Sequence, residues 1–113
     1  MVPRLGYGCL TETREAAVYG LIGQILAVPG ARDELAAILA GMGAMPGCLG
    51  YIVANDAADP DTVWVTEVWE SKQAHATSLN LPEVQDAIAR GRTLIAGFKS
   101  RVETEPVGGI GLD

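Results

Sequence analysis

Basic residues are few in this sequence of 113 residues. Eight lysines and arginines stand against fourteen acidic residues, which gives a formal net charge of −6. The basic residues form no cluster that would neutralise a run of phosphates, so a nucleic acid partner is not expected. The glycine-rich segments never take the spacing of a phosphate-binding loop, and no internal repeat is present.

Cysteine and histidine are scarce as well. Cys9 and Cys48 are the two cysteines and His75 is the one histidine, with no second ligand at the spacing of a metal site, so we expect no bound metal. Charged residues interrupt the first 18 positions, which excludes the apolar stretch of a signal peptide. The charge-free residues 35–55 contain several glycines and a proline, which argues against a membrane-spanning helix. We therefore expect a cytoplasmic protein with free thiols and no membrane partner.

The composition is that of a folded domain, because 49% of the residues are hydrophobic and only 19% are charged. The length suits one compact domain. Residues 1–17 are unpatterned and are expected to form a leader arm, whereas residues 18–113 form the domain and its glycine-rich tail.

Hydrophobic periodicity predicts four strands and three helices. Residues 18–28 are almost continuously apolar, as in a strand covered on both faces, and Pro29 and Gly30 end them. Ser71 is a good helix N-cap, and Pro82 suits the first turn of another helix. The remaining predictions are a helix over 32–42, strands over 49–54 and 62–69 around a turn-rich loop that begins at Asn55, and a last strand over 98–105.

This order predicts an α+β domain of the ferredoxin-like, split βαβ type with a four-stranded antiparallel sheet. Three short helices can cover only one face of such a sheet. The strand over 62–69 carries apolar residues on both faces, so its second face also needs cover. A second copy of the chain is the simplest source, and we expect a homodimer.

Residues 46–51, PGCLGY, and residues 67–71, EVWES, resemble segments of the antibiotic biosynthesis monooxygenase family of small dimeric α+β barrels. The resemblance extends over about residues 18–105 and includes Asp59 and Pro60 of the hairpin loop. It implies a pocket between sheet and helices in which an electron-rich phenol or hydroquinone reacts with O2 without a flavin, haem or metal cofactor. Haem degradation is not expected, because Gly23 and Ile88 stand where haem-degrading members have an asparagine and a ligating histidine.

Four residues are candidates for the site. His75 near a helix N-terminus suits a general base, although a partly buried histidine bound to a backbone carbonyl is an equal alternative. Glu67 shares a strand face with Trp69 and is a candidate for proton transfer, unless it reaches solvent or a partner arginine. Trp69 is expected to form a pocket wall, and Tyr51, in preference to Tyr19, to hydrogen-bond a substrate oxygen.

These residues predict a cofactor-independent monooxygenase that oxidises a small electron-rich aromatic substrate with O2. Two alternatives stay open at this point: a non-enzymatic dimer that binds a small apolar molecule, and an isomerase or lyase of the same fold. Cys48 is expected to pack as a small hydrophobe. We expect exposed ion pairs at Arg90, Arg92, Lys99 and Arg101, unless an anionic substrate recruits one of these residues.

Overall fold

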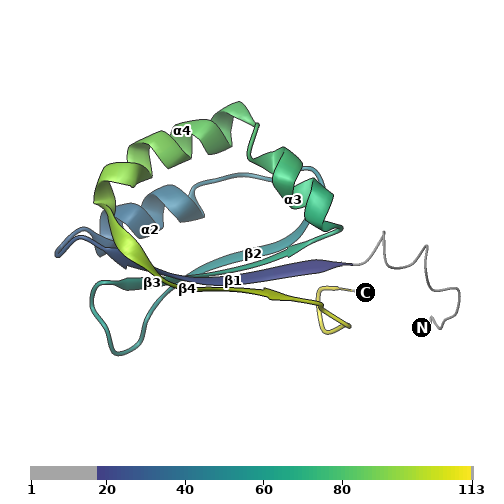
Figure 1. Ribbon diagram of the computed structural model, residues 1–113, viewed down its shortest axis with the longest axis horizontal. Coiled ribbons are helices and arrows are strands. Elements are labelled where there is room, and N and C mark those ends of the chain that lie inside the picture. Colours follow the sequence, from purple (N-terminus) through teal and green to yellow (C-terminus); the bar gives the residue numbers. More distant parts are fainter. Residues whose placement is uncertain (1–17, 113) are drawn as a thin grey trace, which may run out of the picture.

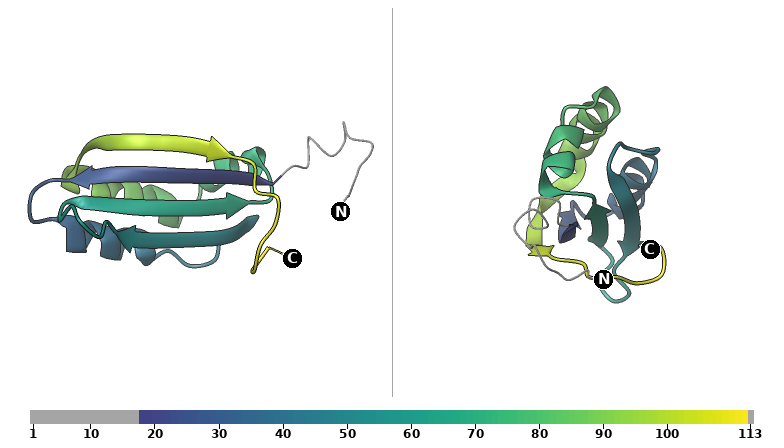
Figure 2. Two further views of the ribbon diagram at one scale, coloured as in Figure 1. Left: turned by 90° about the horizontal axis from the view of Figure 1, so that it is seen from below. Right: turned by 90° about the vertical axis from the view of Figure 1, so that its right-hand side faces the viewer.

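The computed structural model describes residues 18–112, so the predicted leader arm over 1–17 lies outside the described residues. Its centre is one antiparallel sheet with the strand order β2-β3-β1-β4 (Figures 1 and 2). The strands are β1 (Tyr19–Ala27), β2 (Cys48–Asn55), β3 (Thr62–Trp69) and β4 (Ile95–Thr104). This order confirms the predicted ferredoxin-like α+β fold.

All helices lie on one face of the sheet (Figure 1). They are α2 (Arg32–Ala40), α3 (Lys72–Ser78), α4 (Pro82–Gly91) and the short 3-10 helix η1 (Arg92–Leu94). The main contacts of α2 are with β2, β3 and α4, whereas those of α4 are with α2 and η1. Because the backbone of α4 lies farther from the strands than that of α2, space is left between α4 and the sheet.

The predicted helix signals act as expected. The Ser71 hydroxyl accepts a hydrogen bond from the backbone N–H of Ala74 at 3.0 Å and so caps α3. Gly47, in the turn before β2, has φ +81°. A Cβ built at Gly47 would lie 2.7 Å from the Cβ of Ala74, so only glycine lets this turn pack directly against α3.

Three predicted boundaries were wrong. β4 begins at Ile95 rather than Phe98, because register shifts against β1 break the alternation on which the prediction rested. Asn55 belongs to β2, where it pairs with Val63, and Asp56 instead accepts the backbone hydrogen bonds of the turn. The helix α2 ends at Ala40 rather than at residue 42.

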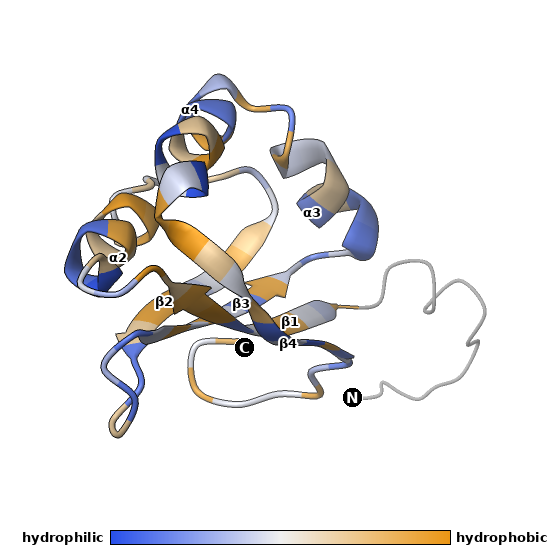
Figure 3. Ribbon diagram, turned by 60° about the vertical axis from the view of Figure 1, so that its left-hand side comes forward, coloured by the Kyte–Doolittle hydropathy of each residue, from blue (hydrophilic) through white to orange (hydrophobic). Residues whose placement is uncertain are grey.

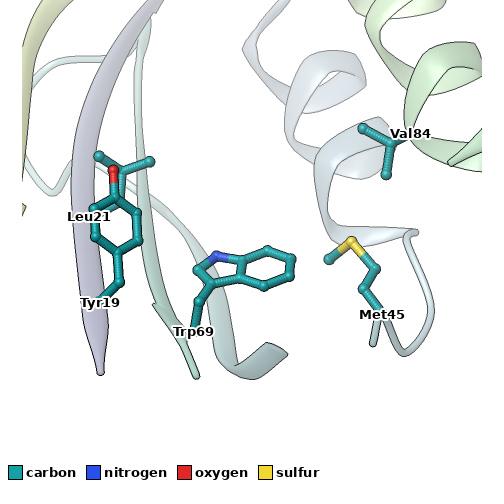
Figure 4. Packing of buried hydrophobic residues seen from close by; sticks show 5 residues of the cluster. All are labelled: Tyr19, Leu21, Met45, Trp69 and Val84. Atoms are coloured by element: carbon teal, nitrogen blue, oxygen red, sulfur yellow. The ribbon is translucent and has the colours of Figure 1, made fainter. Parts of the chain in front are cut away.

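Two hydrophobic clusters fill the layer between sheet and helices. The first contains Ala27, Leu35, Val63 and Val65. The second joins strand residues Tyr19, Leu21 and Trp69 to Met45, from the loop after α2, and Val84 of α4. Figure 4 shows the Trp69 indole pointing from β3 toward Met45 and Val84. The strand and helix walls of this second cluster enclose the site described below.

The opposite face of the sheet has no helix over it (Figure 2). The residues that strand pairing assigns to it are uncharged and include Ile22, Gln24, Leu26, Ile52, Ala54, Thr62, Trp64, Thr66, Val68, Ser100 and Val102. Lys99 Nζ donates to Thr62 Oγ1 of this face at 3.2 Å. Ile52 and Val102 are 64% and 51% exposed. Below, this surface is called the open sheet face. Within residues 18–112, no helix is long and apolar enough to cross a membrane.

Candidate functional site

A cavity of about 720 Å³ lies between the sheet and the helices. Its lining is mostly apolar and comes from every strand and helix of the fold, and Figure 3 shows hydrophobic segments on the strands and inner helix turns that surround it. Tyr51, Glu67, Trp69 and His75, the four residues selected from the sequence, all line this one cavity. The fold therefore brings together side chains from β2, β3 and α3.

Glu67 holds the polar centre of the cavity. One carboxylate oxygen, Oε1, accepts a hydrogen bond from Trp69 Nε1 at 2.9 Å and lies 3.8 Å from His75 Nε2. The Glu67 side chain is only 15% exposed, so the indole donor offsets part of the free energy needed to bury a carboxylate. Trp69 is 1% exposed and fixed by the surrounding cluster, which holds Glu67 in place.

His75 lies in an aromatic sandwich on α3. Its ring centroid is 5.6 Å from that of Tyr19 and 5.4 Å from that of Trp69, which it meets edge to face. Among residues 18–112 the imidazole makes no hydrogen bond, to a backbone carbonyl or otherwise, and its nearest charged neighbour is Glu67. A ligand in the cavity therefore meets an imidazole that has no hydrogen bond to residues 18–112.

Tyr51 is the cross-strand partner of Glu67. Burial, followed by the negative charge of Glu67, raises the pKa of Tyr51 to about 12. The side chain is therefore a neutral phenol at physiological pH and can donate its hydroxyl proton to a ligand oxygen. Burial also raises the pKa of the neighbouring Cys48 thiol, which is free and donates to the carbonyl of Gly50 at 3.5 Å.

Tyr19 and Glu103 were not selected from the sequence as site residues, yet they close one end of the cluster. The Tyr19 hydroxyl donates to Glu103 Oε2 at 2.7 Å, and Lys72 Nζ lies 3.1 Å from the same oxygen. Burial and this bond raise the pKa of Tyr19. No sequence signal marked the pair, because it depends on the register that sets β1 between β3 and β4.

The predicted ion pairs form only in part. Arg90 and Lys99 each bind an aspartate, at 2.8 and 3.1 Å. Arg92 and Arg101, in contrast, have no carboxylate within 4.0 Å in the part of the chain that the structure describes, and both line the cavity. Within residues 18–112, the predicted ion pairs are therefore found for Arg90 and Lys99 and not for Arg92 and Arg101.

The polar groups of the cavity are of types that can accept or donate protons. His75 and Glu67 are the two groups that can accept a proton, and Tyr51 is a donor beside them. Across residues 18–112, no three His, Cys, Asp or Glu side chains are grouped so that they could hold a metal ion. The remaining lining can enclose an apolar ring.

A comparison with protein families identifies the family of this chain. The profile described as antibiotic biosynthesis monooxygenase matches residues 18–90, from β1 into α4. The match covers more than half of the chain and both segments that carried the sequence resemblance. The chain therefore belongs to the antibiotic biosynthesis monooxygenase family.

Solved structures agree. A "putative antibiotic biosynthesis monooxygenase" from Chloroflexus aurantiacus is 57% identical, with a TM-score of 0.83 over 86% of this chain and 100% of that chain. A protein of the same description from Deinococcus radiodurans is 27% identical, with a TM-score of 0.68 over 81% of this chain and 95% of that chain. A Pseudomonas aeruginosa protein at 23% identity, with a TM-score of 0.69 over 83% and 98% of the two chains, shares the fold. None of the curated proteins matches the chain.

Proposed function

We propose that this protein is a cofactor-independent monooxygenase that oxidises a small electron-rich aromatic compound, a phenol or hydroquinone, with O2 as co-substrate. The observation that carries the proposal is the His75 imidazole, which lies 3.8 Å from the Glu67 carboxylate inside a largely apolar cavity. Membership of a monooxygenase family supports the reaction class. The cytoplasm is the expected location.

The reaction begins with removal of a phenolic proton. His75 accepts this proton, and the Glu67 carboxylate stabilises the imidazolium that forms. Tyr51 donates a hydrogen bond to an oxygen of the bound ring and orients it. Because the phenolate is richer in electrons than the phenol, it can transfer one electron to O2, after which the two radicals combine.

For a hydroquinone the electrons balance without an added reductant. Hydroquinone and O2 contain the same atoms as hydroxyquinone and water, so the substrate supplies every electron that reduces the second oxygen atom. The protein has to hold the ring, take the proton and exclude bulk water while the radicals recombine. The apolar lining, with Leu21, Met45 and Val84 around Trp69, suits that enclosure.

We further propose that a second copy of the chain covers the open sheet face. Its paired strand residues are uncharged, with Lys99 bonded to one of them, although the chain as a whole carries a net charge of −6. A two-fold interface sets identical surfaces against each other, and an uncharged apolar surface avoids like-charge repulsion in that arrangement. A dimer formed in this way would cover the open sheet face of each subunit and leave both cavities accessible.

The size of the particle in solution tests the dimer. Light scattering should give twice the chain mass for the wild type, and Ile52→Glu should give the monomer, because it would place a carboxylate inside the interface. Ile88→Glu is the matched control, since Ile88 is 42% exposed on α4, away from the open sheet face. A wild-type monomer, or equal effects of the two variants, would rule out this interface.

Oxygen uptake tests the chemistry. Hydroquinone should cause O2 consumption by the wild type, and His75→Phe should abolish most of it while keeping the ring between Tyr19 and Trp69. Gln73→Ala, on the same helix but outside the cavity, should retain the wild-type rate. Turnover at equal rates with and without air would instead indicate an isomerase or lyase. Tight binding without turnover of any electron-rich aromatic compound would indicate a binding protein.

A further inference from the structure

The basic residues that line the cavity have no role in the proposed reaction. Within residues 18–112, four basic residues are engaged: Arg32 donates to backbone carbonyls, and Lys72, Arg90 and Lys99 bind carboxylates. Within this part of the chain, Arg92 and Arg101 have neither kind of partner, although the sequence has an excess of acidic residues. Both of these arginines line the cavity.

Arg101 lines the cavity from β4, beside a glycine of β1. It is the cross-strand partner of Gly23 in β1, and Val65 is the partner of Gly23 on the other side. A Cβ built at Gly23 would meet only the carbonyl oxygen of Ser100, at 3.8 Å. The missing side chain leaves room beside the backbone of Arg101 for part of a ligand.

Arg101 is also close to the proposed base. Its positive charge opposes the rise in the pKa of Tyr19 and lowers the pKa of Glu103, the carboxylate to which the Tyr19 hydroxyl donates. The Tyr19 ring in turn lies 5.6 Å from the His75 ring. A ligand that reaches His75 with one group can therefore present another group to Arg101.

The charges in the cavity favour an anion. Glu67 is the one acidic residue of the lining, and its Oε1 is held by the Trp69 indole. Among residues 18–112, the two arginines of the lining have no carboxylate within 4.0 Å and outnumber this one lining carboxylate. The planar guanidinium matches a carboxylate with two parallel hydrogen bonds. The rest of the lining is apolar, so the complementary ligand has a ring and one acidic group.

We infer that the ligand of this cavity is an aromatic carboxylic acid whose carboxylate binds Arg101 while its ring lies against Trp69. The inference deepens the proposed function and rests on it for the phenolic or quinol hydroxyl that meets His75. Arg101 then determines which electron-rich aromatic compounds are accepted, and Gly23 keeps the position next to it open.

Calorimetric titration with a matched pair of ligands tests this inference. The pair is 2,5-dihydroxybenzoic acid, which is hydroquinone with one carboxylic acid group, and its methyl ester. The two compounds share the ring and hydroxyls and differ in charge. The wild type should bind the acid at least tenfold more tightly than the ester. Added salt should weaken binding of the acid and leave the ester unaffected. Equal affinities for the two ligands, or binding of neither, would overturn the inference.

Substitutions locate the anion partner. Arg101→Gln should weaken binding of the acid about tenfold or more and leave the ester unchanged, and Arg101→Lys should recover part of the difference. Arg90→Gln is the matched control, because Arg90 pairs with Asp86 on the exposed side of α4 and does not line the cavity. Loss of acid binding in Arg92→Gln with Arg101→Gln unaffected would contradict the assignment to Arg101.

This inference and the proposed function fail in different ways. Binding selectivity can be measured without turnover. Selective binding of the acid without O2 consumption would therefore refute the proposed monooxygenase activity and still support an aromatic carboxylic acid as the ligand. O2 consumption with neutral hydroquinone, together with equal binding of acid and ester, would refute the aromatic carboxylic acid as the ligand and still support the monooxygenase activity.

Discussion

Substitutions of Gly23 should change the stability of the fold and the affinity of the cavity for its ligand in opposite directions. Its side of β1 carries Leu21 and Ile25, both of which line the cavity, so a side chain at position 23 would project between them. A Cβ at this position would have its nearest neighbouring atom 3.8 Å away, so it would fit without a clash. Replacing glycine inside a strand with valine should stabilise the fold by about 0.5–1 kcal/mol.

Binding should respond in the opposite direction. A ligand that needs the space beside Arg101 would be overpacked by Gly23→Val, at a cost of about 1–3 kcal/mol, which weakens affinity by roughly one to two orders of magnitude. The series Gly23→Ala, Gly23→Val and Gly23→Leu should show falling affinity as the side chain grows, without loss of thermal stability. Melting curves and calorimetric titration measure the two effects. Wild-type affinity and turnover in Gly23→Leu would refute our placement of the ligand.

Three further predictions concern single side chains. Leu35→Ala should destabilise the fold by about 2–5 kcal/mol in urea unfolding, because Leu35 is 0% exposed. Tyr51→Phe should lower kcat about tenfold with little change in stability, since it removes one donor. The Trp64 indole and loop N–H groups lower the pKa of Asp56 from 3.8 to about 2, so its stabilising effect is present above pH 3.8 and lost as pH falls toward 2. Asp56→Asn should flatten the pH dependence of unfolding in that range.

The fold was predictable because its signals are local. The apolar run of β1, the Ser71 cap and the proline in the first turn of α4 each act within a few residues, and the order of elements then fixes the topology. The start of β4 was missed because its register shifts depend on pairing with β1, which no local pattern reveals.

The candidate site was only partly predictable. Alternation along β3 was enough to set Glu67 and Trp69 on one face, and the α3 signals brought His75 above it. The Tyr19 bond to Glu103 and the unpaired Arg101 depend on strand register and on competition among charges for partners. Contacts of this kind form between residues that are distant in the sequence and depend on the complete tertiary structure. The sequence therefore predicts which residues line the cavity better than it predicts their hydrogen-bond and ion-pair partners.

The most direct test of the account is the fate of labelled O2 in single turnovers with a hydroquinone. We predict that mass spectrometry will find one labelled oxygen atom in each hydroxyquinone and the other in water, with the yield lost in His75→Phe. Label that enters the product from water, or a product formed equally in the absence of O2, would contradict the proposal that this cavity performs monooxygenation.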